Sequence, residues 1–184
     1  MNAFLFDPAA EAERFTARRE FLARQEALRI DLAPGVTLQP ETAESVEDQI
    51  RETLLAEGIQ PVQGSPDYQE AARSFAALAP RREFGRISMA ATLFLGFPAA
   101  ERDARLWALD GFPETLALEL TDGQRILPAV DRGAARPGER LPAVLALRWS
   151  IPPGLAIAAL ATDHPIIPGR FPAPPSWGRW TQVD

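Results

Sequence analysis

The chain has 184 residues, of which 46% are hydrophobic and 24% are charged. This composition is typical of one globular domain, and we expect residues 1–184 to form it. The chain contains no cysteine, and all 19 of its basic residues are arginine. These two absences exclude disulfides, cysteine-ligated metal centres, a Schiff-base lysine and a P-loop lysine. The net charge of −6 argues against a nucleic-acid-binding surface.

The apolar segments of the chain predict no contact with a membrane. The N-terminal residues lack the basic start and the long apolar core of a signal peptide. The longest uncharged apolar runs, 87–100 and 149–162, have 14 residues each, fewer than the ~20 that span a bilayer. We therefore expect a cytoplasmic protein.

The N-terminal half of the sequence predicts three helices and two short strands. Apolar residues recur at every fourth position from Val46 to Leu54, which is the spacing of one helix face. Leu28, Ile30 and Leu32 instead alternate with polar residues, which is the strand pattern. In chain order, the predicted elements are a helix over 8–26, strands over 28–32 and 36–38, and helices over 42–58 and 65–80.

The C-terminal half predicts mostly strands. The most apolar stretch, residues 86–96, is typical of a central strand. A hairpin with a three-residue loop follows, and we expect it to pair Leu120 with Ile126. The remaining predicted elements are a short helix over 97–109, strands over 144–150 and 155–162 joined by IPPG, and an extended tail over 165–184. We expect Trp177 and Trp180, rather than ladder bonds, to hold this tail to the body.

These elements predict an α+β fold. We expect a mostly antiparallel sheet of about five to seven strands, with about three or four helices packed on one face. The first two helical regions carry opposite charge. Residues 14–29 hold five arginines and two glutamates, about +3, and residues 41–57 hold six acids and one arginine, about −5. Either the two regions pair with each other, which we favour, or they form a docking surface for a partner.

His164 is the only histidine of the chain and the candidate general base. The adjacent Asp163 is the candidate partner of its imidazole, although neighbouring residues of an extended chain point to opposite faces. The alternative is structural: Asp163-His164-Pro165 ends a strand, because proline cannot donate a ladder hydrogen bond. We favour this structural interpretation, since nothing in the spacing indicates a catalytic group.

Arg148 is the candidate ligand-binding residue. On strict alternation it shares a strand face with Val144 and Ala146. That face is therefore either partly exposed to solvent or carries a buried arginine that needs a carboxylate or another anion.

One histidine and no cysteine exclude the common metal sites, and no EF-hand spacing occurs, so we expect no metal and no cofactor.

Five short segments occur in the order and approximate spacing of one uncharacterised bacterial family. They are LRIDLAPGVTLQPET, EDQIRETLLAEGI, AATLFLGF, VLALRWSI and TDHP. Through them the chain resembles the domain of unknown function 3501 family from about Phe15 to Pro165. The resemblance implies a single α+β domain in a cytosolic bacterial protein, and it brings no established activity or catalytic residue. Genes of that family often neighbour rubrerythrin and an iron–sulfur reductase-like protein, which implies a role near oxidative-stress or non-haem-iron chemistry.

The absence of any redox-competent or nucleophilic constellation, together with this resemblance, favours a non-enzymatic accessory or interaction protein in a redox or non-haem-iron system. The expected partner is a rubrerythrin or an iron–sulfur reductase-like protein. Two alternatives stay open. One is an enzyme or small-molecule-binding protein that uses His164 with Arg148 in a cleft. The other is a structural homodimer that buries an exposed sheet face against a second copy.

Overall fold

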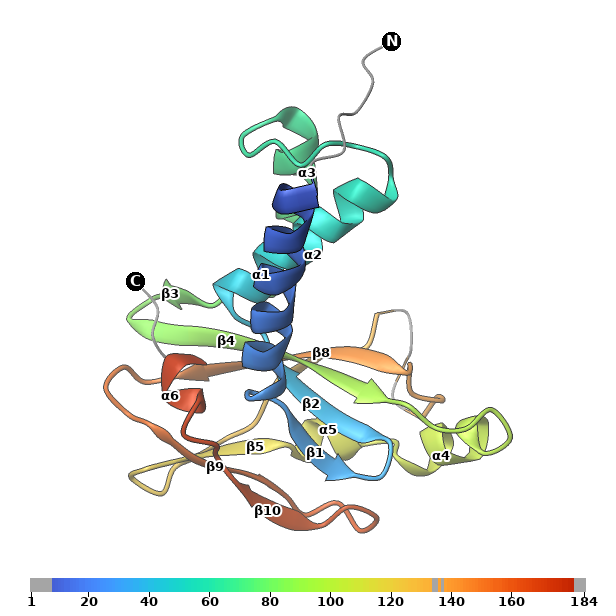
Figure 1. Cartoon of the computed structure of the whole chain (residues 1–184). Helices are drawn as coiled ribbons and strands as arrows, with labels where there is room; N and C mark the ends of the chain where they lie inside the picture. Colours follow the sequence, from blue (N-terminus) through green and yellow to red (C-terminus); the bar gives the residue numbers. More distant parts are fainter. Residues whose placement is uncertain (1–7, 134–135, 137, 181–184) are drawn as a thin grey trace.

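The computed structural model describes residues 8–133, 136 and 138–180. The first residues, on which the signal-peptide expectation depends, and the end of the tail lie outside this part. The described chain forms two antiparallel sheets that enclose one core, with three helices rising from the larger sheet (Figure 1). The α+β class with antiparallel pairing is confirmed. The strands divide over two sheets, where we expected one.

The larger sheet has the strand order β1-β2-β4-β8-β7, and β3 also pairs with β4. Its central strand β4 is the predicted central strand, and it is largely buried on both faces. The face with Ile87, Met89 and Leu93 packs in the core between the sheets, and the opposite face, with Ser88 and Thr92, lies towards the helices. The strands are β1 (Ile30–Ala33), β2 (Val36–Pro40), β3 (Arg81–Glu83), β4 (Arg86–Leu95), β7 (Ala129–Asp131) and β8 (Val144–Ile151).

The smaller sheet has the order β10-β9-β5-β6. Because β8 and β9 belong to different sheets, the predicted IPPG connection carries the chain from one sheet to the other. The beginning of the tail pairs with β9 as β10, so the expectation of a tail without ladder bonds is wrong for that segment. The strands are β5 (Ala117–Leu120), β6 (Arg125–Ile126), β9 (Ile157–Thr162) and β10 (Gly169–Pro172).

Tryptophans fill one end of the core between the sheets. Trp149 is fully buried, donates from Nε1 to the Leu116 carbonyl at 3.0 Å, and meets Trp180 edge-on at 6.0 Å. Trp177 and Trp180 belong to the short helix α6 (Trp177–Trp180), and both are buried. Burying a large apolar side chain contributes roughly 1.5–3 kcal/mol.

Helices α2 (Ala43–Ala56) and α3 (Pro66–Phe75) form a hairpin that leaves the larger sheet after β2 and returns as β3. Strands β2 and β3 both pair with the same edge of β4, and β8 pairs with its opposite edge. Thr42 and Ser65 cap the two helices through their side chains. The hairpin has a small core of its own, formed by Val46, Ile50, Leu54 and Tyr68.

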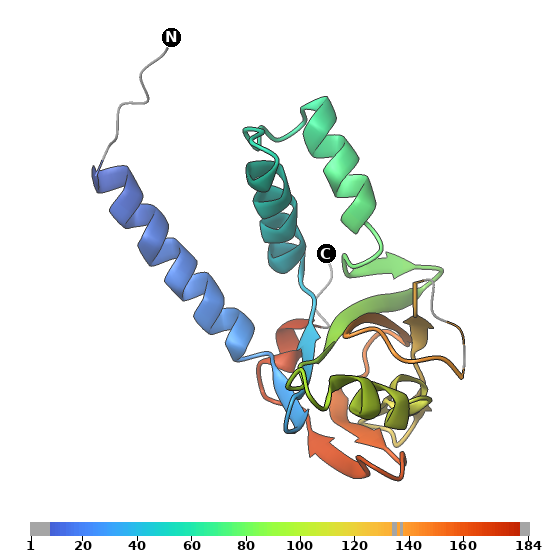
Figure 2. The same cartoon turned by 90° about the vertical axis from the view of Figure 1, so that its right-hand side faces the viewer.

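Helix α1 (Pro8–Glu26) stands beside α2 (Figure 2). Ion pairs join the two helices: Arg18 bonds Asp48 and Arg24 bonds Glu44. The two oppositely charged regions therefore pair with each other, as the favoured interpretation predicted. Each ion pair is partly exposed and therefore contributes little to the free energy of folding on its own.

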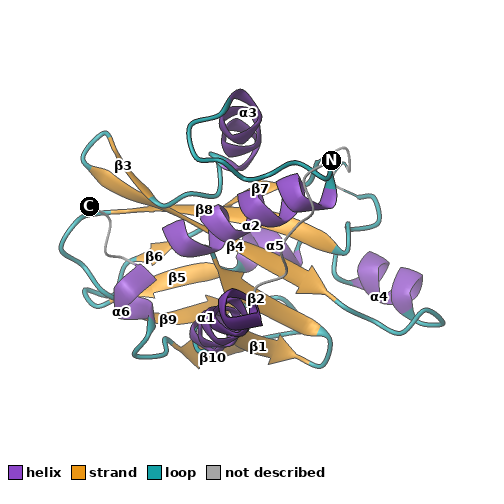
Figure 3. Cartoon of the chain, turned by 45° about the horizontal axis from the view of Figure 1, so that its top comes forward, coloured by secondary structure: helices purple, strands orange, loops and turns teal. Residues whose placement is uncertain are grey.

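Helices α1, α2 and α3 all lie on the same face of the larger sheet (Figure 3). Two shorter helices, α4 (Arg102–Ala108) and α5 (Phe112–Thr115), connect β4 to β5. No helix within the described ranges is both long and apolar enough to cross a bilayer.

Candidate functional site

His164 lies just after β9, is 7% exposed, and faces main-chain groups with both ring nitrogens. Nδ1 accepts a hydrogen bond from the Ile166 N–H at 3.4 Å, so the proton sits on Nε2. Nε2 then donates to the Asp110 carbonyl oxygen at 3.3 Å. The ring also packs edge-on against Phe112, with 5.6 Å between centroids. His164 therefore ties the end of β9 to the turn before α5.

The three sequence candidates do not form one site. The side chain of Asp163 is 74% exposed and pairs with Arg125 at 3.2 Å, away from the buried His164 ring. Arg148 lies on β8 of the larger sheet, whereas His164 follows β9 of the smaller sheet. No hydrogen bond, ion pair or ring contact described for these residues links His164 to Arg148 or Asp163.

An ion-paired cluster adjoins His164. Arg132 is only 10% exposed and reaches Asp110 Oδ1 at 2.9 Å and Glu114 Oε1 at 2.6 Å. Its hydrogen bond lowers the pKa of Asp110, and the Gly138 N–H acts in the same direction against the effect of burial. The two carboxylates, Glu114 first, raise the pKa of Arg132. Asp110 and Arg132 are therefore held charged, so they stabilise the fold and are poor proton donors or acceptors.

Replacing His164 with alanine is expected to lower the free energy of unfolding by about 2 kcal/mol, because a buried ring and its main-chain hydrogen bonds are lost. Urea unfolding measures this loss, and Asp163→Ala, at an exposed position, is expected to stay within about 0.5 kcal/mol. Nitrogen-15 NMR of the wild type is expected to show the Nε2–H tautomer. A His164→Ala protein as stable as wild type would contradict the structural role.

Arg148 lies half-buried on the face of the larger sheet that carries the helices, here called the helix-side face. Its partners in register are Ala90 on β4 and Ala129 on β7, whose small side chains leave room for the guanidinium. Among the described residues Arg148 has no hydrogen-bond acceptor, and its Nε is buried. An unpaired buried N–H costs about 1–3 kcal/mol. Arg148 is thus a cation whose charge the described chain does not neutralise.

Glu41 is a buried acid on the helix-side face, with only 2% of its surface exposed. Its carboxylate accepts hydrogen bonds from Thr92 Oγ1 at 2.6 Å, Ser45 Oγ at 2.7 Å and Gln49 Nε2 at 2.9 Å. Because Thr92 belongs to β4 and the other two donors belong to α2, Glu41 fastens the helical hairpin to the sheet. No sequence motif indicated this role, since it depends on the register of β2 against β4.

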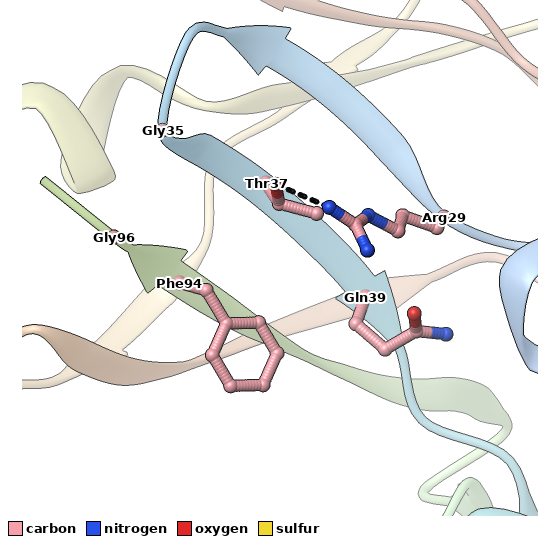
Figure 4. A pocket seen from close by; sticks show the side chains of 6 residues that line it. All are labelled: Arg29, Gly35, Thr37, Gln39, Phe94 and Gly96. Atoms are coloured by element: carbon pink, nitrogen blue, oxygen red, sulfur yellow. Dashed lines mark hydrogen bonds between the residues drawn. The ribbon is translucent and has the colours of Figure 1, made fainter.

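A shallow hollow of about 380 Å³ lies on the helix-side face (Figure 4). Arg29 extends over it and donates to Thr37 Oγ1 at 3.3 Å. The lining residues lie on or beside three neighbouring strands, so the hollow has a floor but no facing wall. Small-molecule sites usually enclose most of the ligand surface, which this geometry does not do. The lining residues are Arg29, Gly35, Thr37, Gln39, Phe94 and Gly96.

Phe94, which lines the hollow, and its ladder neighbour Val144 are two exposed apolar side chains of this face. Phe94 is 42% exposed and Val144 is 55% exposed, and they stand opposite each other in the ladder between β4 and β8. Polar Thr37 pairs with Phe94 on its other side. An apolar centre with a polar rim is typical of a protein-contact surface. Alternation places Phe94 on the same face as Ser88 and Thr92, but it does not show that Phe94 is left uncovered by the helices.

Within the described ranges, no group of three histidine, aspartate or glutamate side chains lies close enough to hold a metal ion. A family model for proteins of unknown function, DUF3501, matches residues 8–166. The chain belongs to the DUF3501 family. This confirms the resemblance drawn from the five sequence segments.

A crystal structure of a protein of unknown function from Burkholderia pseudomallei has a similar fold, with a TM-score of 0.74 and 21% sequence identity. The match covers 98% of the DUF3501 chain and 96% of that chain. At this identity the likeness establishes the fold alone. None of the curated proteins matches the DUF3501 chain significantly.

Proposed function

We propose that this DUF3501 chain is a non-enzymatic interaction protein that binds a partner protein on its helix-side face, at the hollow. The observation that carries the proposal is the exposed pair of Phe94 and Val144, held side by side on two central strands. Two rigid strands present these side chains, so little conformational entropy is lost when a partner covers them.

The polar groups around the pair support a protein partner. Thr37 and Gln39 line the hollow, and Arg29 places a guanidinium at its edge. Such groups form hydrogen bonds with the main chain or the carboxylates of a bound polypeptide. Arg148, which lacks a partner among the described residues, is on the same face and offers a second contact for an acidic group.

An enzymatic function has less support. The chain has no cysteine or lysine, and main-chain groups occupy both ring nitrogens of His164. The alternative of a cleft that combines His164 with Arg148 requires them to share a surface. His164 instead packs against Phe112 in the main core, whereas Arg148 lies on the helix-side face.

The proposed partner class is a redox or non-haem-iron protein, either a rubrerythrin or an iron–sulfur reductase-like protein. The family resemblance is the only support for this choice of partner. The DUF3501 chain would carry no cofactor of its own and would act by positioning or protecting the partner.

Replacing Phe94 with serine is expected to weaken binding of the partner at least about tenfold, because Phe94 forms the apolar centre of the contact. Isothermal titration of the purified chain against purified rubrerythrin and against the reductase-like protein measures this effect. Leu127→Ser is the matched control, since Leu127 is 63% exposed and lies in the connection between β6 and β7.

Equal affinity of the Phe94→Ser and wild-type proteins would exclude the hollow as the binding surface. If neither candidate binds wild type, the choice of partner is wrong. Sedimentation at several concentrations addresses the homodimer alternative. A wild-type mass that doubles with concentration, while Phe94→Ser stays a monomer, would make a second copy the occupant of the hollow.

A further inference from the structure

The hairpin between β3 and β4 ends in the two-residue loop Phe84-Gly85, because Glu83 pairs with Arg86. This loop projects from the larger sheet beside the label β3 in Figure 1. Phe84 is 96% exposed, more than any other large apolar side chain of the described residues. Both loop residues have positive φ, 49° for Phe84 and 73° for Gly85.

Positive φ suits Gly85 and strains Phe84. Two-residue hairpin loops with positive φ at both positions favour Asn-Gly, because a bulky side chain crowds the main chain there. Phe84 is the one non-glycine residue with positive φ in the described part of the chain. Its exposed ring gains almost no packing that could offset this strain. A strained aromatic residue that adds nothing to the core indicates a function at the tip.

The hairpin is braced and carries positive charge. Arg86 donates from Nε to Ser150 Oγ at 2.9 Å and from Nη2 to the Ser150 carbonyl at 2.5 Å, which ties the hairpin to β8. Arg81 pairs with Glu83 at 3.3 Å. The groups that Arg86 bonds on Ser150 are uncharged, so its guanidinium contributes positive charge beside the tip. An exposed aromatic side chain beside an arginine is the composition of a binding hot spot.

We propose that this tip anchors a partner protein, with Phe84 inserted into an apolar pocket bordered by carboxylates. The aromatic ring requires an apolar pocket, and the local positive charge favours an acidic border. A membrane fits less well, because one phenylalanine buries little area and anionic lipid repels a chain of net charge −6.

The contact goes beyond the function proposed for the hollow. Phe84 precedes the first residue of β4, whereas Phe94 lies near the last residue of that strand. The two places are roughly 30 Å apart at 3.3 Å per residue of strand. A variant at one place therefore leaves the other intact, and the two proposals can fail separately.

The first test is the stability of Phe84→Gly. Glycine adopts the positive φ without strain, so the unfolding midpoint is expected to rise by about 2–4 °C. A midpoint below that of wild type would show that Phe84 serves the fold, and would overturn the proposal. Because the variant is expected to be the more stable protein, a loss of binding cannot be attributed to unfolding.

The second test identifies what Phe84 contacts. Photoreactive benzoylphenylalanine replaces Phe84 in the full chain, the expressing cells are irradiated, and mass spectrometry maps the cross-linked residues. We expect one protein product whose cross-linked residues line an apolar pocket bordered by aspartate or glutamate. Excess wild-type chain is expected to reduce the yield at least about tenfold, and excess Phe84→Gly to leave it unchanged. The same label at Leu127, also exposed, is the matched control.

Each other outcome overturns the proposal. Cross-links to lipid would indicate a membrane contact, and cross-links to the chain itself would indicate self-association. Equal competition by wild type and Phe84→Gly, or the same product from the label at Leu127, would show that the aromatic tip carries no specificity. Absence of any product would show that Phe84 has no partner in the cells that express the chain.

Discussion

Replacing Trp177 with alanine is expected to lower the free energy of unfolding by about 4 kcal/mol. The side chain is 1% exposed and meets Trp180 edge-on at 4.9 Å. Its Nε1 donates to the Leu28 carbonyl at 2.7 Å, just after α1. The substitution therefore opens a cavity in the main core and also leaves a buried carbonyl without its donor. Both effects act in the same direction.

Chemical denaturation followed by circular dichroism measures this loss. Trp107→Ala is the matched control, because Trp107 is 53% exposed on α4. We expect the control to change stability by no more than about 0.5 kcal/mol. Equal effects of the two substitutions would show that Trp177 does not hold the tail to the body.

Replacing Glu41 with alanine is expected to destabilise the protein by about 3 kcal/mol. Two effects oppose each other at this position. Removing a buried carboxylate without a cation relieves its desolvation, which favours the variant. The donors on Thr92, Ser45 and Gln49 then lose their acceptor, and a cavity remains between α2 and the sheet. The loss is larger, because three hydrogen bonds to one charged group disappear together.

Glu41→Gln separates these two effects. The amide oxygen keeps an acceptor of the same size, and the hydroxyls of Thr92 and Ser45 can rotate to accept from the amide nitrogen. We expect this variant to lose only about 1 kcal/mol. Hydrogen exchange is expected to show that Glu41→Ala reduces amide protection first in α2 and α3. A loss spread evenly over both sheets would contradict the role of Glu41 as a fastener of the hairpin.

Local signals predicted the helices and most strands well. Thr42 and Ser65 cap their helices by accepting a hydrogen bond from the N–H group three residues further on, an interaction between residues that are close in the sequence. The predicted register of the β5–β6 hairpin was wrong, because Ile126 pairs with Leu118 and not with Leu120. The Leu120 N–H bonds the Gln124 carbonyl instead, which closes a three-residue loop.

Long-range packing decided the features that the sequence could not predict. A turn such as IPPG has the same local chemistry whether it closes a hairpin or carries the chain to a second sheet. His164 is another case, because the Asp110 carbonyl that it bonds lies 54 residues away. Its strand-end position was predictable from Pro165, and its hydrogen-bond partners were not. The exposure of Phe94 was not predictable either, because it depends on where the helices end above the sheet and not on the residues next to Phe94 in β4.

The return of the α2–α3 hairpin to the same edge of β4 has a consequence for the continuity of the sheet. The ladder that β2 and β3 build on β4 is interrupted between Pro40 and Arg81, but neither strand changes place. The pairing along this edge therefore does not depend on the length of the segment inserted between the two strands. The sheet and the helical hairpin are separate parts of the fold, joined at the two ends of the insertion and through Glu41.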